Sequence, residues 1–300
     1  MARQMSLFPA RDRFKEKASL PEGELGALDE MFFASERFRS SLEYLELLGF
    51  MARFPRYSAF NCFLLYIQNP EISYVATAGI WKKRFKRKLK INARPLVILA
   101  PMSPVRFLYD VADTEGDPAP AALLKPGAAG DSLSKKVYER TIHNSRLHGI
   151  MVQEVAWGGQ ADESAVELTE ASRGRYKDLA LDPKAVFLVL LNADHRLEDK
   201  YSALVYELGR IFCGHRGVAE GGWWPERKNP APLVKTLEAE SVAYLVCRRC
   251  GLLKKAEKYV SAYREKERRL PALGLNSVLQ ATNYIEAMGR AEWKAPKKSN

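Results

Sequence analysis

The chain lacks most of the features that mark secreted, membrane-embedded or repetitive proteins. Its four cysteines have no regular spacing across 300 residues, so no disulfide framework is expected. The longest apolar run, from Ala185 to Leu191, is far too short to cross a bilayer, and the first 14 residues contain arginines without a continuous apolar segment. No internal repeat is found. These absences predict a soluble protein of a reducing cytoplasm, without a signal peptide and without a membrane partner.

Acidic residues are scarce in one part of the chain. The formal net charge is +11, and residues 51–100 hold ten Lys and Arg against a single acid, Glu71. Residues 151–200, by contrast, hold six Lys and Arg against ten acids. A local excess of cations predicts a surface that faces an anionic partner, and the competing interpretation is a solvated charged face.

The spacing of apolar residues predicts an α+β protein of two modules. The first module combines helices with a small antiparallel sheet, and the second is a mixed half that ends in helices. Helices are expected over residues 28–54, 59–68, 132–147, 200–213 and 233–250, with further helix to residue 290. Strands are expected over residues 74–78, 96–99, 107–111, 153–155, 165–168 and 185–192. The expected domains are an N-terminal lead-in at 1–27, the first module at 28–115, a linker at 116–131, the second module at 132–293 and a basic tail at 294–300.

The ten residues from Trp81 to Lys90 contain seven cations and two aromatic rings. Because the run lies between strand-like segments, we expect a hairpin arm. Cations neutralise phosphates and rings stack on unpaired bases, so the combination favours single-stranded DNA, although the charge alone also suits acidic proteins or membrane surfaces. The expected nucleic-acid contacts are Arg56, Asn61, Gln68, Trp81, Lys82, Lys83, Arg84, Phe85, Lys86, Arg87 and Lys88.

Three of these residues have an equally simple structural interpretation. The amides of Asn61 and Gln68 suit either a base or phosphate of the ligand or the local backbone of a helix. Trp81 suits either stacking on a base or packing in the core at the end of a strand. The sequence alone does not decide between the two.

Several short segments of the first module resemble a known domain. They are Tyr57-Ser58-Ala59-Phe60-Asn61, Gln68-Asn69-Pro70, Ala76-Thr77 with Trp81, Leu96-Val97-Ile98-Leu99-Ala100-Pro101, and Tyr109-Asp110-Val111-Ala112-Asp113-Thr114. Over residues 56–116 the chain is similar to the N-terminal domain of the ArdC antirestriction family, although Asn92 stands where that family usually has glycine. The resemblance implies single-stranded DNA as the partner.

The second module contains a degenerate version of a zinc-binding helix. Zincins hold zinc with two histidines at positions i and i+4 of a helix, and the Glu after the first histidine is the general base. Here the corresponding residues read Tyr206-Glu207-Leu208-Gly209-Arg210. Together with a strand at 187–192, an acidic helix at 237–244 and a closing helix at 276–288, the run resembles the ArdC C-terminal domain and the ImmA/IrrE metallopeptidases. The resemblance implies a zincin-like domain over about residues 185–290.

Both histidines of the motif are replaced. Tyr206 is a poor zinc ligand, and Arg210 stays protonated and cannot coordinate a metal at all. We therefore expect a vestigial general base in Glu207, no zinc cofactor and no peptidase activity. Instead, Arg210 is expected to supply the cation that balances Glu207, Glu238 and Glu240.

Alternatives for the metal remain open. The third-ligand position of the family falls on Glu238, Glu240 or Thr236, and the spacing does not choose among them. His215 is expected to cap or pack rather than to bind metal, and the alternative is an active zinc metallopeptidase in which His215 and Glu238 or Glu240 hold zinc while Glu207 acts as the base. A different zinc site, built from the cysteines and His215, is the least favoured.

The sequence thus predicts a protein that acts by binding. It carries a single-stranded-DNA-binding module and an inactive zinc-peptidase-like domain, with a regulatory or antirestriction-like role that comes from the resemblance alone. The zincin-like groove is a further place for a protein partner.

Overall fold

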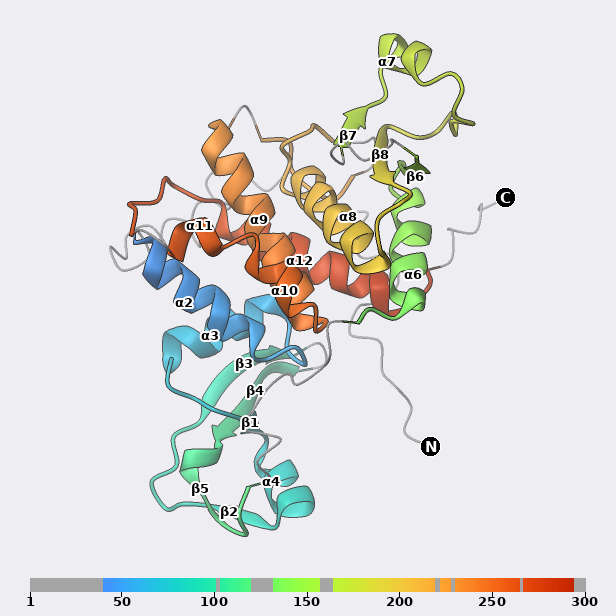
Figure 1. The fold of residues 1–300 in the computed structure, drawn as a ribbon. Coiled ribbons are helices and arrows are strands. Elements are labelled where there is room, and N and C mark those ends of the chain that lie inside the picture. The colour runs from blue at the N-terminus through green and yellow to red at the C-terminus, as the bar shows by residue number, and fades with distance from the viewer. Residues whose placement is uncertain are drawn as a thin grey trace. The chain divides into compact units, whose positions relative to one another are not determined.

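The computed structural model describes residues 40–100, 103–119, 132–156, 164–218, 222–227, 230–264 and 267–293, so the expected lead-in, most of the linker and the basic tail lie outside the described residues. The chain divides into two compact units (Figure 1). The predicted α+β class is confirmed.

The unit boundary falls later than the predicted start of the first module at residue 28. Helix α2 (Ser41–Ala52) contributes its first eight residues to the second unit and its last four, from Gly49, to the first. The Tyr44 hydroxyl donates to Ser241 Oγ at 2.8 Å, and the Ser41 backbone N–H donates to the Arg268 carbonyl at 2.9 Å. These long-range contacts, invisible to a local pattern, explain why residues 41–48 group with the second unit.

The first unit packs helix α3 (Ala59–Gln68) against a three-stranded antiparallel sheet in the order β1-β4-β3. The predicted N-cap is confirmed, because Ser58 Oγ accepts the Asn61 N–H at 3.2 Å. The strands are β1 (Val75–Ala76), β3 (Leu96–Ala100) and β4 (Ser103–Asp110). A short second pair joins β2 (Arg87–Leu89) to β5 (Thr114–Gly116), after the 3-10 turn η3 (Val111–Asp113).

The predicted hairpin arm is wrong over its first half, which forms helix α4 (Ala78–Phe85). Thr77 caps this helix by accepting the Ile80 N–H, and Lys and Arg are good helix formers. Trp81 and Phe85 stand four residues apart, so a helix places both rings on one face, where their centroids lie 5.2 Å from each other. The cations therefore project from a helix, and Lys86, at a φ of 54°, turns the chain into β2.

The free edge of the sheet is covered by side chains from α3. Asn61 donates to the Leu99 carbonyl and accepts the Leu99 N–H, both at 3.0 Å. Gln68 does the same for Val97, at 2.8 and 2.7 Å. Both amides thus bond the backbone of β3. Gln68 Nε2 also donates to the Leu64 carbonyl, one turn earlier in α3, at 2.7 Å, so the local-backbone interpretation holds in part for Gln68.

The second unit is built on a mixed sheet in the order β6-β8-β7. Its central strand β8 (Phe187–Asn192) is buried throughout, pairs in parallel with β6 (Ile150–Val155) and antiparallel with β7 (Ser164–Glu167). The helices are α6 (Lys135–Arg146), α7 (Glu170–Arg175), α8 (Leu197–Phe212), α9 (Pro232–Arg249), α10 (Leu253–Glu257), α11 (Ser261–Arg264) and α12 (Leu275–Arg290). Helices α8, α9 and α12 pack on one another and form the buried centre of this unit. Within the described part of the chain, no helix combines the length and apolarity needed to span a membrane.

The amide cover of β3 generates a first prediction. Asn61→Ala and Gln68→Ala should each remove two hydrogen bonds to β3, so the Leu99 and Val97 amides respectively should exchange faster with deuterium. The double variant should lose about 2 kcal/mol of unfolding free energy in the first unit. The control Gln280→Ala removes an exposed amide that bonds only the Asn276 side chain among described partners, and should change stability by less than about 0.5 kcal/mol. Unchanged exchange at both amides would contradict the edge contacts.

Candidate functional site

Helix α8 brings together the carboxylate and the cation of the degenerate motif. Glu207 is 3% exposed, and Arg210 Nη1 donates to its two carboxylate oxygens at 3.2 and 3.4 Å. Burial raises the pKa of Glu207, and the charges of Arg210 and Arg216 and a backbone hydrogen bond from Ala165 in β7 oppose that rise. The predicted pairing of Glu207 with Arg210 is therefore present, and it engages the carboxylate that would act as a general base.

Tyr206, the other replaced histidine position, lies on the same helix and stacks on Tyr259, with ring centroids 5.8 Å apart and planes within 5°. Burial raises its pKa, so the phenol stays neutral. Glu240 of α9 accepts a hydrogen bond from the Tyr263 hydroxyl at 2.9 Å, and burial raises its pKa as well. Its hydrogen-bond partner is thus a phenol and not the guanidinium of Arg210.

Glu238 is the centre of a separate buried network. The carboxylate is fully buried and accepts from the Gly274 N–H at 2.7 Å, from His215 Nε2 at 2.6 Å and from Arg227 Nη1. Burial alone would raise its pKa, but the hydrogen bonds from His215 and Arg227 and the charge of Arg227 outweigh it and hold the pKa below the usual value. The expectation that Arg210 balances all three glutamates is therefore wrong: its hydrogen bonds go to Glu207, and Arg227 balances Glu238.

A group able to hold a metal lies in this network. Cys213, His215 and Glu238 each offer one ligand atom, these atoms lie within 4.8 Å of one another, and all three residues are buried. When Nε2 of His215 carries the proton given to Glu238, Nδ1 is left as a buried acceptor without a partner among the described residues. Thiolate, imidazole and carboxylate are the donors that zinc takes in proteins.

Two features weaken the ability of Cys213, His215 and Glu238 to bind a metal ion. Burial raises the pKa of the Cys213 thiol and lowers that of His215, so the thiol and the imidazole are both neutral near pH 7. The Glu238 carboxylate already forms an ion pair with the Arg227 guanidinium, which a metal ion would have to displace. Cys247 and Cys250 do not complete the set, since only Cys213, His215 and Glu238 come together within the described ranges.

The residues at the two histidine positions do not fit a zincin metal. Arg210 has no lone pair to offer and is engaged with Glu207, and Tyr206 is held neutral in a ring stack. Arg227 was missed from the sequence, because it lies in the loop before α9 with no motif around it. Its role becomes visible only when helix packing brings it to Glu238.

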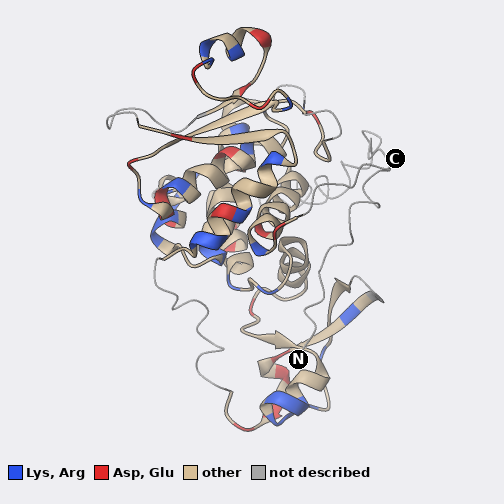
Figure 2. Cartoon of the chain, turned by 90° about the vertical axis from the view of Figure 1, so that its right-hand side faces the viewer, with Lys and Arg blue, Asp and Glu red and all other residues tan. Residues whose placement is uncertain are grey.

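The cations predicted to contact nucleic acid lie at the surface of the first unit, and Figure 2 shows Lys and Arg in blue on α4. Arg56 is also exposed, in the turn before α3. Arg87 differs, because its guanidinium donates to Thr114 Oγ1 and to the backbone carbonyls of Thr114 and Asp117. The exposed cations of this stretch are Lys82, Lys83, Arg84, Lys86, Lys88 and Lys90.

Neither of the two aromatic rings of the predicted arm, those of Trp81 and Phe85, is fully exposed to solvent. Trp81 is fully buried, its indole N–H donates to the Tyr109 carbonyl at 2.9 Å, and Phe85 is half-buried against it. The core interpretation of Trp81 is therefore the one that the structure supports. It anchors the cationic helix to the sheet.

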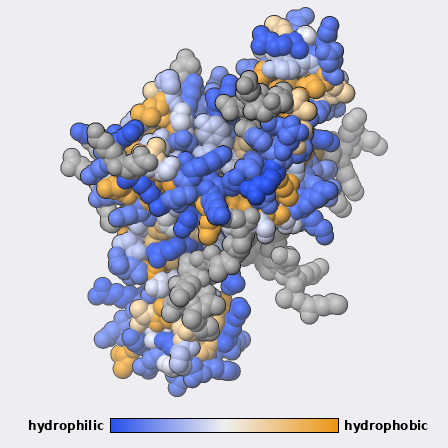
Figure 3. Space-filling model, viewed as in Figure 1, coloured by the Kyte–Doolittle hydropathy of each residue, from blue (hydrophilic) through white to orange (hydrophobic). Residues whose placement is uncertain are grey.

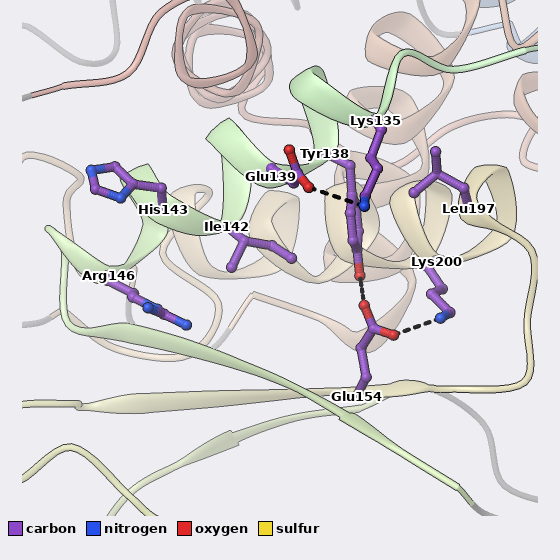
Figure 4. A pocket seen from close by; sticks show the side chains of 9 residues that line it. All are labelled: Lys135, Tyr138, Glu139, Ile142, His143, Arg146, Glu154, Leu197 and Lys200. Atoms are coloured by element: carbon purple, nitrogen blue, oxygen red, sulfur yellow. Dashed lines mark hydrogen bonds and ion pairs between the residues drawn. The ribbon is translucent and has the colours of Figure 1, made fainter.

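A pocket of about 570 Å³ opens between α6, β6 and the start of α8 (Figure 4). At its centre the Glu154 carboxylate accepts from the Tyr138 hydroxyl at 2.8 Å and from Lys200 Nζ at 2.5 Å. Burial opposes ionisation of Glu154, yet these two hydrogen bonds hold its pKa below the usual value. The Glu154 carboxylate is thus neutralised by Lys200, whereas the exposed Arg146, which also lines the pocket, forms no ion pair with a described residue.

Comparison of the chain with family models, with curated proteins and with solved structures found no match in any of the three. The chemistry of the site is accordingly interpreted from its own residues.

The Glu207–Arg210 pair generates a second prediction. Arg210→Gln removes the adjacent cation, so the pKa of Glu207 should rise further above its value of about 4.3 in the unfolded chain. At a pH where the carboxyl is protonated in both the folded and the unfolded chain, it does not lower the free energy of unfolding. As the pH rises from the unfolded-state pKa toward the folded-state pKa, the loss of unfolding free energy grows. Urea denaturation should show a loss of about 3 kcal/mol at pH 8 and far less at pH 4.

The control is the double variant Glu207→Gln with Arg210→Gln, which removes both members of the pair. Its stability relative to the wild type should depend much less on pH than that of the single variant. A loss in Arg210→Gln that is equal at both pH values would show that packing, and not the ion pair, is what Arg210 supplies.

Proposed function

We propose that this protein binds nucleic acid through the exposed cations of its first unit. The observation that supports the proposal is the concentration of six exposed cations in the nine residues from Lys82 to Lys90, on a helix and a strand fixed to the sheet. Phosphate groups spaced along a strand are the ligand that such a row of cations suits best.

No described acidic residue neutralises these cations, although the Arg84 guanidinium lies over the Phe85 ring at 5.6 Å. Among the described residues none of the six forms an ion pair, although β2 and β5 align Lys88 with Glu115. An acid-poor surface of this kind keeps its positive potential, which attracts polyanions at long range. The proposal rests on the charge of the six cations and not on the rings of Trp81 and Phe85, because those rings face the core.

For the second unit, the proposed role excludes peptidase chemistry of the His-Glu-x-x-His type. The general-base position is neutralised by Arg210, and neither flanking position offers a zinc ligand. The alternative is a zinc site at Cys213, His215 and Glu238, which its donor set and the unpartnered His215 Nδ1 favour and the Arg227 contact opposes.

A third prediction tests the binding of nucleic acid. The full chain should bind a labelled 20-nucleotide single strand, and log Kd should change with log salt by about 0.7 per phosphate neutralised. Replacing Lys82, Lys83, Lys86 and Lys88 by serine should weaken binding at least about tenfold and lower that slope, as measured by fluorescence anisotropy.

The matched control replaces four exposed cations of the second unit, Lys136, Arg175, Lys177 and Lys184, by serine, which makes the same change in net charge. Equal losses in both variants would mean that net charge alone attracts the strand. Binding to anionic vesicles or to an acidic polypeptide, but to no nucleic acid, would contradict the proposal.

A fourth prediction separates the two accounts of the metal. If Arg227 neutralises Glu238, zinc should leave the melting temperature of the wild type unchanged relative to a chelator. Arg227→Gln should melt lower in chelator and be rescued by zinc, because Cys213, His215 and Glu238 then provide three ligands; saturation at 100 times Kd would restore about 2.7 kcal/mol. The double variant with Cys213→Ala should not be rescued. A zinc-dependent rise in the wild type, lost in Cys213→Ala, would establish the alternative.

A further inference from the structure

One face of the first unit's sheet is apolar although it faces solvent. Side chains alternate along a strand, so Val97 and Leu99 of β3 share a face with Val105 and Phe107 of β4, and the register pairs Val97 with Phe107 and Leu99 with Val105. Leu99 is 52% exposed, Val105 37% and Phe107 53%. An antiparallel sheet with one solvated face ordinarily carries polar residues there, so this surface is an exception that a ligand would explain.

The register of these strands is fixed from the opposite side. Leu96, Ile98 and Leu108 all lie on the other face and are buried, as is Asp110, which accepts the backbone N–H groups of Ser73 and Tyr74. A slip by one residue would expose this core, so the exposed apolar face is a stable property of the unit. Figure 3 shows apolar surface, in orange, among the hydrophilic surface of this unit.

The strand that carries Phe107 also anchors the cationic helix. Tyr109, half-buried, follows Phe107 on the same face of β4 at a distance of about 7 Å along the strand. The carbonyl of Tyr109 accepts the Trp81 indole N–H, so α4, with its exposed lysines, is anchored at this end of the strand. An exposed aromatic ring on a unit that also exposes cations suits a ligand that alternates flat bases with phosphates.

We infer that the exposed face of β3 and β4 receives the unpaired bases of a single-stranded nucleic acid, with Phe107 as the main stacking ring. The inference rests on the proposed function and adds to it the surface on which the bases lie; the preference for a single strand is the one already expected from the sequence. Bases inside a duplex are already stacked and cannot lie on Phe107, whereas both forms offer phosphates to α4. The positive charge of α4, which is anchored to the same strand, favours this occupant over an apolar protein partner or a second copy of this equally cationic chain.

The test compares the affinity of the full chain for a 20-nucleotide single strand and for a duplex of the same sequence. Phe107→Ala should weaken single-strand binding about tenfold, the effect expected for one stacked base, and leave duplex binding within about twofold. Phe107→Tyr, which keeps a ring, should retain most of the single-strand affinity. Ile67→Ala is the matched control, because Ile67 is 50% exposed, close to the 53% of Phe107, and lies on α3 of the same unit; it should change neither affinity.

The outcomes separate the inference from the proposed function. If the lysine-to-serine variant weakens binding and Phe107→Ala does not, cations bind the strand without this face and the inference is overturned. If the wild type binds neither form, both fail. Equal losses for single strand and duplex in Phe107→Ala, or a wild-type dimer that this variant converts to monomer in sedimentation, would show that the face packs against something other than bases.

Discussion

Glu238 is the constraint on which the second unit depends. Its carboxylate is removed from solvent and accepts from three segments at once: the turn after α8 through His215, the loop before α9 through Arg227, and the start of α12 through the Gly274 N–H. A buried carboxylate is tolerated only when its oxygens are satisfied, so each donor must stay in place. The space around it is correspondingly small. A Cβ added at Gly274 would meet Arg227 Nη1 at 3.0 Å and Glu238 Oε1 at 3.2 Å.

This arrangement also explains how a helix that resembles a metal-binding one can persist without histidines. Where a zincin would use a cation from solution, the chain supplies guanidinium groups: Arg210 at Glu207 and Arg227 at Glu238. Each guanidinium opposes the rise in pKa that burial imposes on its carboxylate, and at Glu238 the pKa falls below the usual value. The Glu207 carboxylate is paired with Arg210 and is therefore not a free base.

The sequence predicted what depends on neighbours along the chain. Helix α3 was found because Ser58 caps it and Pro70 follows it, and the Glu207–Arg210 pair was found because three residues separate them on one helix. Helix α4 was missed because its cations suggested an arm, although the Thr77 cap and the spacing of Trp81 and Phe85 were local signals of a helix. Contacts across the fold could not be predicted. The pairing of Arg227 with Glu238, the bonds of Asn61 to β3 and the exposure of Phe107 all depend on which elements come to lie side by side.

The amides that cover β3 have a consequence for behaviour in concentrated solution. Growth of an ordered aggregate from a sheet requires an open backbone edge onto which the next chain can add, and an exposed apolar face invites such growth by letting added layers stack. In the first unit the apolar face is present, but Asn61 and Gln68 take up donors and acceptors of β3 that an incoming strand would need. The apolar face can therefore be exposed while the adjacent edge, at Val97 and Leu99, offers a further strand no open backbone groups.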